Sequence, residues 1–186
     1  MYMDPIRREL LTVIANNTKY GDFTLHSGAK STLYIDMDRV MLSPQGNFLC
    51  STMLMDTIIH MYPNVAQIGG KAMGGVPLLT GVLQKMYAMP RYHYVRGFYL
   101  RNTDNPAKNK LEGEIHNVPT VIVEDVMTTG SSVLETITHV ENAGGTVSGI
   151  VTVVDRRVKK GPLRYPDSVG DYPVDSLFTE TDVAEV

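Results

Sequence analysis

Residues 120–132 hold the side chains in this chain that are best suited to chemistry. They read TVIVEDVMTTGSS, which is a β-branched run, two acids (Glu124 and Asp125), and then small hydroxyl residues around one glycine. The β-branched run is typical of a strand buried in a parallel sheet. Because an ionised carboxylate beside such a strand needs partners, the two acids indicate a binding site. A pair of carboxylates is suited to the vicinal hydroxyls of a ribose.

The residues that follow the acids favour phosphate binding. Val133, Ile137 and Val140 recur at helical spacing, so we expect a helix to begin near Gly130. A loop of small residues at a helix N-terminus presents backbone N–H groups and a positive dipole end. The alternative is an ordinary strand-to-helix turn whose serines cap the helix. A Walker A loop and a dinucleotide fingerprint are both excluded, since the required lysine and the GxGxxG pattern are missing.

Over its whole length, this stretch resembles the phosphoribosyl pyrophosphate (PRPP) binding motif of type I phosphoribosyltransferases. The shared features are a hydrophobic strand, two acids, two further residues, and TTG followed by a small residue. The resemblance implies that Glu124 and Asp125 hold the ribose hydroxyls and act in catalysis. It implies further PRPP contacts from the rest of the motif: Val126, Met127, Thr128, Thr129, Gly130, Ser131 and Ser132.

Residues 69–75, reading GGKAMGG, form a second candidate phosphate site. They follow a predicted strand at 65–68 and precede a helix that we expect to begin at Pro77. Four glycines in seven positions allow the backbone to approach a ligand closely, although a flexible turn would have the same composition. The segment resembles the pyrophosphate-binding loop of the same enzymes, which implies that Lys71 neutralises the departing diphosphate.

Two further segments resemble orotate phosphoribosyltransferases in particular. The run from residue 23 to 36, FTLHSGAKSTLYID, is similar to their N-terminal F-T-L-K-S-G-R-x-S-P-Y-x-x-D, with His26 and Ala29 in place of the usual lysine and arginine. Asp155-Arg156 follows a predicted strand at 147–154 and is similar to the family's own D-R pair. The resemblance implies that the orotate site is built from His26, Tyr34, Thr128 and Arg156.

The stretch from 97 to 114 is polar and lacks periodicity, and a predicted strand at 92–95 leads into it through Arg96. Such stretches inside a compact domain are usually functional. In type I phosphoribosyltransferases this position holds the loop that closes over the active site, and Arg96 fits the first position of its R-K-x-x-K-x-H-G pattern.

The usual lysine and histidine of that loop pattern are missing here. When Arg96 is aligned to the first position, Leu100 and Asn102 replace them. Arg96 is then expected to contact PRPP, and a substitute cation is needed for catalysis. The candidates are Arg101, Lys108 and Lys110, with Arg101 favoured.

Composition excludes several classes of protein. The chain has 186 residues, 43% hydrophobic and 20% charged, which is an ordinary globular balance. Its net charge of −3 offers no basic surface for nucleic acid. The single cysteine, Cys50, fits a reducing compartment, and no apolar run reaches the roughly 18 residues of a membrane span. We therefore expect a cytoplasmic protein that binds neither nucleic acid nor membranes.

The order of predicted elements indicates the fold. Strands near 65, 92, 120 and 147 alternate with helices, which calls for a doubly wound α/β core with a mainly parallel sheet. We expect helices at 4–17 and from Ser43-Pro44, strands at 23–25 and 33–37, and a last strand at 174–178. The expected domain is a single one over residues 1–186. Residues of about 20–40 and part of the C-terminal tail would form a small hood over it.

The resemblance implies an orotate phosphoribosyltransferase that makes orotidine 5′-monophosphate and diphosphate from orotate and PRPP. It also implies a homodimer and Mg²⁺ carried by PRPP, with Asp125 as the one candidate protein ligand. Two alternatives stay open: a type I enzyme for another nucleobase, and a non-catalytic regulator that binds PRPP or nucleotides.

Overall fold

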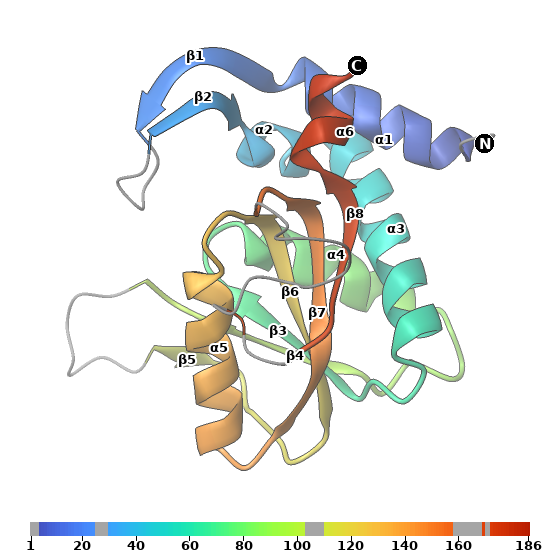
Figure 1. Ribbon diagram of the computed structural model, residues 1–186. Coiled ribbons are helices and arrows are strands. Elements are labelled where there is room, and N and C mark those ends of the chain that lie inside the picture. Colours follow the sequence, from blue (N-terminus) through green and yellow to red (C-terminus); the bar gives the residue numbers. More distant parts are fainter. Residues whose placement is uncertain (1–3, 25–29, 103–109, 158–168, 170–171) are drawn as a thin grey trace.

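A six-stranded sheet forms the centre of the computed structural model, which describes residues 4–24, 30–102, 110–157, 169 and 172–186. The strand order is β5-β4-β3-β6-β7-β8, and every neighbouring pair is parallel except β4 with β5 (Figure 1). The strands are β3 (Gln67–Lys71), β4 (Arg96–Leu100), β5 (Leu111–Glu112), β6 (Pro119–Met127), β7 (Thr146–Asp155) and β8 (Val174–Thr179).

Helices cover both faces of this sheet, as expected for a doubly wound fold. α3 (Pro44–Met61) and α4 (Gly75–Tyr87) lie on one face and α5 (Ser131–Asn142) on the other (Figure 1). Alternate residues of β6 enter two separate apolar clusters, since Val121 and Val123 pack on the α3/α4 side and Ile122 on the α5 side. A strand buried on both faces requires the continuous apolar run that the sequence shows.

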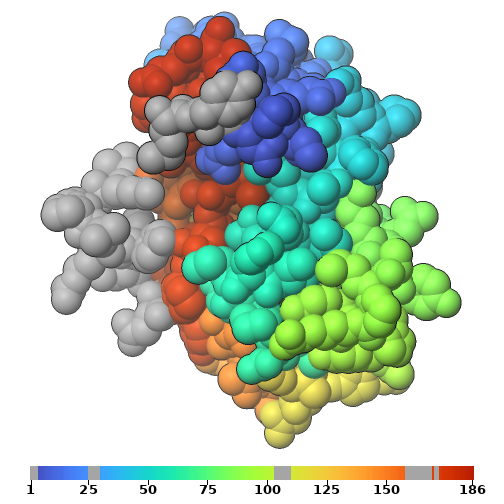
Figure 2. All heavy atoms as spheres, turned by 90° about the vertical axis from the view of Figure 1, so that its right-hand side faces the viewer, coloured from blue at the N-terminus to red at the C-terminus, as the bar shows by residue number. Residues whose placement is uncertain are grey.

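The hood consists of an antiparallel pair and three helices at one end of the sheet (Figure 1). In the space-filling view, α1 in blue lies directly above α3 in teal (Figure 2). The hood elements are α1 (Pro5–Asn16), β1 (Thr18–Thr24), β2 (Lys30–Ile35), α2 (Met37–Met41) and α6 (Glu180–Ala184). The pair was predicted, but β1 begins earlier than expected. An irregularity between Tyr20 and Phe23 carries the strand through Gly21, whose φ of 151° suits glycine.

The predicted strand at 92–95 is wrong. These residues form turns, in which the Tyr92 N–H donates to Met89 O and the Val95 N–H donates to Tyr92 O. β4 begins only at Arg96, so this arginine starts a strand instead of ending one.

β3 also differs from the prediction, because it continues through the first two glycines of residues 69–75. At Gly69 a Cβ would come within 2.1 Å of the Phe98 ring. This glycine is therefore required by packing within the sheet, and only the later part of the segment forms a loop.

The chain reverses its winding direction between β3 and β6. β3 leads through α4 to β4 on one side, whereas β6 leads through α5 to β7 on the other. The loops that leave the carboxyl ends of two such neighbouring strands diverge and open a crevice, the usual ligand site of an open α/β sheet. Within the described ranges, no helix combines the length and apolarity that a membrane crossing requires.

Candidate active site

Glu124 and Asp125 lie near the carboxyl end of β6, which ends at Met127. Successive strand residues point to opposite faces, so Glu124 shares the α5 side and Asp125 the α4 side. Burial, and to a smaller extent the charge of Asp125, raise the pKa of Glu124 to about 8, although Lys71 opposes both effects. Burial also raises the pKa of Asp125, although hydrogen bonds from the backbone of Val126 and Asp125 lower it in part. Both side chains are half-buried at this end of the sheet, and their surroundings disfavour the charged form of each.

The loop after β3 packs directly on Asp125. A Cβ at Gly74 would come within 2.3 Å of Asp125 Oδ2, and one at Gly70 within 2.6 Å of Val123 O. The peptide bond between Ala72 and Met73 in this loop is cis. The glycine-rich segment and the acid pair are therefore parts of one site.

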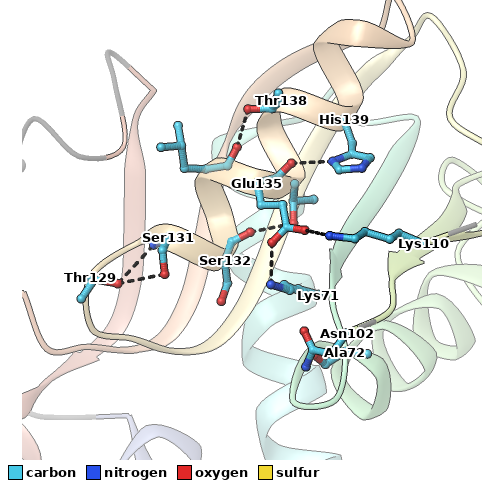
Figure 3. A network of polar contacts seen from close by, with 12 residues as sticks. Lys71, Ala72, Asn102, Lys110, Thr129, Ser131, Ser132, Glu135, Thr138 and His139 are labelled. Atoms are coloured by element: carbon cyan, nitrogen blue, oxygen red, sulfur yellow. Dashed lines mark hydrogen bonds and ion pairs between the residues drawn. The ribbon is translucent and has the colours of Figure 1, made fainter. Parts of the chain in front are cut away.

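The loop after β6 leads directly into α5. Gly130 takes φ 80° and ψ 4° at the N-cap, where it has no side chain that could cap the helix. Thr129 Oγ1 donates to Ser131 Oγ at 3.0 Å and accepts from the Ser131 N–H at 3.3 Å (Figure 3). Thr129 thus binds the first N–H group of α5, while the positive end of the helix dipole still favours an anion here.

Lys71 extends from the end of β3 toward α5. Its Nζ lies 2.5 Å from Glu135 Oε2, and Lys110 Nζ lies 3.3 Å from Glu135 Oε1 (Figure 3). Asn102 Nδ2 donates to Ala72 O at 2.8 Å, which ties the residues after β4 to the loop after β3.

Arg96 and Arg101 lie at opposite ends of β4. Arg96 pairs with Gln67 at the start of β3, whereas Leu100 pairs with Lys71 at its end. At about 3.3 Å per residue, the start of β4 is roughly 13 Å from the end that faces the acids. Arg96 therefore does not belong to the site, contrary to our expectation. Arg101 directly follows β4 at the correct end, where its Nε lies 3.0 Å from Glu112 Oε1.

This placement also corrects the alignment of the loop pattern. Arg101, at the end of β4 that faces the acids, fits its first position better than Arg96 does, and Asn102 then stands at the second. The difference follows from the strand predicted at 92–95, which would end at Arg96, whereas β4 begins there.

Arg156 joins three parts of the molecule. Its backbone N–H donates to Met127 O at 2.9 Å, its Nε donates to Glu180 Oε2 at 2.6 Å, and its Nη2 donates to Ser31 Oγ at 2.8 Å. The side chain is only 8% exposed. Arg156 thus lies where the motif after β6, the hood and α6 meet, and the two side-chain bonds use two of its five N–H donors.

Tyr34 of β2 is close enough to respond to the acid pair. Burial raises its pKa, and the charges of Asp36, Asp38 and Asp125 raise it further. His26 and Lys108, the other two predicted site residues, lie outside the described residues.

The structure brings together most of the residues that the sequence singled out. The end of β3, the end of β6 and the start of α5 place Lys71, the acid pair and the hydroxyl-rich loop in the crevice between β3 and β6. Two acids were missed, Glu135 and Glu180, which hold Lys71 and Arg156. The partners of both acids are distant in sequence, so no local spacing pointed to them.

The acid pair fits a metal ion only if the substrate supplies most of the ligands. Among the described residues, no group of three or more His, Cys, Asp and Glu side chains could hold a metal. Mg²⁺ is commonly bound through one or two carboxylates together with substrate phosphates, and this donor set matches that pattern.

Comparisons with known proteins agree with this geometry. The phosphoribosyl transferase domain family matches residues 68–185. The orotate phosphoribosyltransferase of Methanosphaera stadtmanae is 31% identical over 166 residues, which cover 83% of this chain and 84% of the relative. That of Methanocaldococcus jannaschii is 36% identical over 139 residues, 74% of each protein.

A solved structure is similar over almost the whole chain. The crystal structure of Mycobacterium tuberculosis H37Rv orotate phosphoribosyltransferase in complex with inorganic phosphate has 26% sequence identity and a TM-score of 0.72. The similarity covers 97% of this chain and 99% of that one. Together with the family match, these relatives show that the chain belongs to the type I phosphoribosyltransferase family and is an enzyme similar to its orotate phosphoribosyltransferases.

Proposed function

We propose that the protein converts orotate and PRPP into orotidine 5′-monophosphate and diphosphate. The observation that carries this proposal is the position of Arg156 between the motif after β6 and Ser31 of the hood. A guanidinium group in that position is suited to the carboxylate of orotate, because its fork binds a carboxylate through two hydrogen bonds. Similarity to relatives named for orotate supports the same base.

The loop between β6 and α5 would hold the 5′-phosphate of PRPP. It offers hydroxyl groups, the first N–H groups of α5 and the positive end of the helix dipole. The residues assigned to this role are Thr128, Thr129 and Gly130 of the loop and Ser131 and Ser132 at the start of α5, whereas Val126 and Met127, which the resemblance also assigned to PRPP, lie within β6.

The acid pair would hold the ribose and stabilise its transition state. With a pKa of about 8, Glu124 is largely protonated near neutral pH, so it can both donate to and accept from a ribose hydroxyl. Asp125 then supplies the negative charge beneath a ring that becomes cationic as the bond to diphosphate breaks. A fixed negative charge in a partly buried site is an effective way to stabilise such a transition state.

The leaving diphosphate would be bound by cations at the ends of β3 and β4. Lys71, Arg101 and Lys110 are the described candidates, and Lys108 remains a further candidate by sequence. Asp125 is the residue that would help PRPP to hold Mg²⁺, which would supply positive charge for the diphosphate.

A second candidate is transfer to another nucleobase. The observation in its favour is the ion pair of Arg156 with Glu180, whose oxygen lies 2.6 Å from Nε. An arginine already neutralised by an acid attracts a second carboxylate less strongly, so a base without a carboxylate would then be accepted.

We also propose that the chain acts as a single cytoplasmic domain and pairs as a homodimer. Support for the dimer comes from apolar side chains left exposed beside a groove between α3 and α4, where Leu42 is 77% and Phe48 59% exposed. Phe48→Glu should yield a monomer of 20.6 kDa in light scattering, whereas Met61→Glu, at the end of the same helix, should not. A parent protein that is already monomeric contradicts this pairing.

The reaction is tested by incubating the protein with orotate, PRPP and Mg²⁺ and detecting orotidine 5′-monophosphate by chromatography. The parent should form it, and Asp125→Asn should lower kcat/KM for PRPP more than about tenfold, equivalent to about 1.4 kcal/mol. A folded parent that forms no product, or an Asp125→Asn variant with unchanged kcat/KM, contradicts the assignment.

A further inference from the structure

Glu135 on α5 holds two lysines that reach it from different parts of the sheet. Lys71 ends β3, and Lys110 immediately precedes β5. Each binds a different oxygen of the same carboxylate, at 2.5 Å and 3.3 Å (Figure 3). The three side chains are 21% (Lys71), 28% (Glu135) and 39% (Lys110) exposed, so a ligand in the crevice can reach them.

The two lysines keep this carboxylate charged. Burial alone would raise the pKa of Glu135, but hydrogen bonds from Lys71 and Lys110, together with their charges, outweigh burial and lower it. The group therefore carries a full negative charge at the edge where the loop after β3 begins.

A carboxylate and a phosphate compete for the same donors. Each presents anionic oxygens that accept charge-assisted hydrogen bonds from an ammonium group. Any oxyanion that binds Lys71 in this crevice must share the ammonium group with Glu135 or displace it, and it also meets repulsion from the Glu135 charge.

We propose that Glu135 is an internal competitor of diphosphate for Lys71 and Lys110 and thereby sets how tightly diphosphate binds and how readily it leaves. This inference rests on the proposed function, because it takes the crevice to be the diphosphate site. Glu135 is a positioning residue: it acts on diphosphate through the two lysines, which it holds in place in the free protein. Removing its charge should tighten the binding of diphosphate instead of weakening it.

A purely structural role for Glu135 makes a different prediction. If the carboxylate only joined α5 to the sheet, its loss would lower the free energy of unfolding and would leave diphosphate binding equal or weaker. The direction of the change in affinity therefore separates the two roles.

The test is calorimetric titration of inorganic diphosphate, with Mg²⁺ present, into the full chain and its Glu135→Gln variant. Glutamine keeps the shape of the side chain and one acceptor oxygen but removes the charge. We expect the Kd for diphosphate to fall about tenfold in this variant. The Ki of diphosphate as a product inhibitor against PRPP should fall in parallel. The matched control is Glu141→Gln, which makes the same charge change on an exposed residue of the same helix and should leave Kd unchanged.

A double-mutant cycle with Lys110→Gln tests whether the effect passes through the shared lysines. In that background, the tightening produced by Glu135→Gln should shrink, because one of the two contested donors is gone. Unchanged or weaker diphosphate binding by Glu135→Gln overturns the inference, as does a tightening that persists in full without Lys110. If the folded parent binds diphosphate and turns over PRPP but Glu135→Gln behaves like the parent, only this inference fails. If the parent neither binds diphosphate nor turns over, the proposed function fails with it.

Discussion

The carboxyl group of Asp125 lies against the α-carbon of Gly74, so closely that a Cβ at Gly74 would come within 2.3 Å of Oδ2. At Gly75, the next residue along the chain, the nearest atoms to a Cβ are 3.6 Å away. Gly74, which precedes α4, and Gly75, which begins it, should therefore tolerate an added methyl group very differently.

Gly74→Ala should displace Asp125 or the loop after β3 and lower kcat/KM for PRPP by more than about tenfold. Gly75→Ala adds the same methyl group in ordinary van der Waals contact and should keep most of the activity. Steady-state kinetics of both variants, with circular dichroism to confirm folding, checks this prediction. Equal effects of the two substitutions would show that the contact between Gly74 and Asp125 does not shape the site.

The raised pKa of Glu124 predicts a dependence of stability on pH. Its pKa rises from 4.5 to about 8 on folding, mainly through burial. Between these values the native state keeps a proton that the unfolded chain has released, so the free energy of unfolding falls as pH rises. Glu124→Gln removes this loss. The free energy of unfolding of Glu124→Gln minus that of the parent should therefore be larger at pH 8.5 than at pH 4.5, by on the order of 2–4 kcal/mol.

Urea unfolding at both pH values measures this difference. The exposed Glu185 supplies the control, since Glu185→Gln should show no such change with pH. A stability difference between Glu124→Gln and the parent that is the same at both pH values would mean that Glu124 ionises normally in the folded protein.

Arg156 should determine the affinity for the base. Arg156→Ala is expected to raise KM for orotate by more than about tenfold and to change KM for PRPP much less. Arg156→Lys keeps the charge but loses the fork geometry, so its KM for orotate should lie between those of the parent and the alanine variant. If both Michaelis constants rise together, Arg156 has a structural role, and the orotate proposal loses its main support.

Arg96 and Arg101 provide a test of the corrected alignment. Arg101 follows the end of β4 that faces the acids, and Arg96 begins the strand at the far end. Arg101→Ala should lower kcat while leaving PRPP affinity nearly intact, with a milder loss for Lys108→Ala. Arg96→Ala should behave like the parent. Single-turnover kinetics separates the chemical step from product release, and a loss in Arg96→Ala as large as in Arg101→Ala would restore the original alignment.

The elements next to the site were predictable because local pattern and tertiary environment agree there. The run before Glu124 is apolar at every position because both faces of β6 are covered, and the small residues around Gly130 match a left-handed N-cap with φ 80°. Similarly, Gly144 ends α5 with φ 79°, as its position after the helix suggested.

The misplaced strand at 92–95 shows the limit of such reasoning. Tyr92 and Val95 are β-prone and buried, but they lie three positions apart and pack from turns, so their burial lacks the alternation of a strand. β4 itself begins with Arg96 and Gly97, which have low strand propensity. It forms because its neighbours provide pairing partners, in particular Gly69 beneath the Phe98 ring. The same holds for Glu135 and Glu180, whose partners are distant in sequence, so only the folded chain reveals their roles.

Diphosphate release from PRPP in the presence of a panel of bases tests the central claim most directly. The panel is orotate, uracil, hypoxanthine, guanine, xanthine and adenine, each with Mg²⁺ and equal amounts of the parent protein. We predict release with orotate at a kcat/KM at least about a hundredfold above that with any other base, because only orotate carries a carboxylate for Arg156. Faster release with a base that lacks a carboxylate, or no base-dependent release at all, would contradict it.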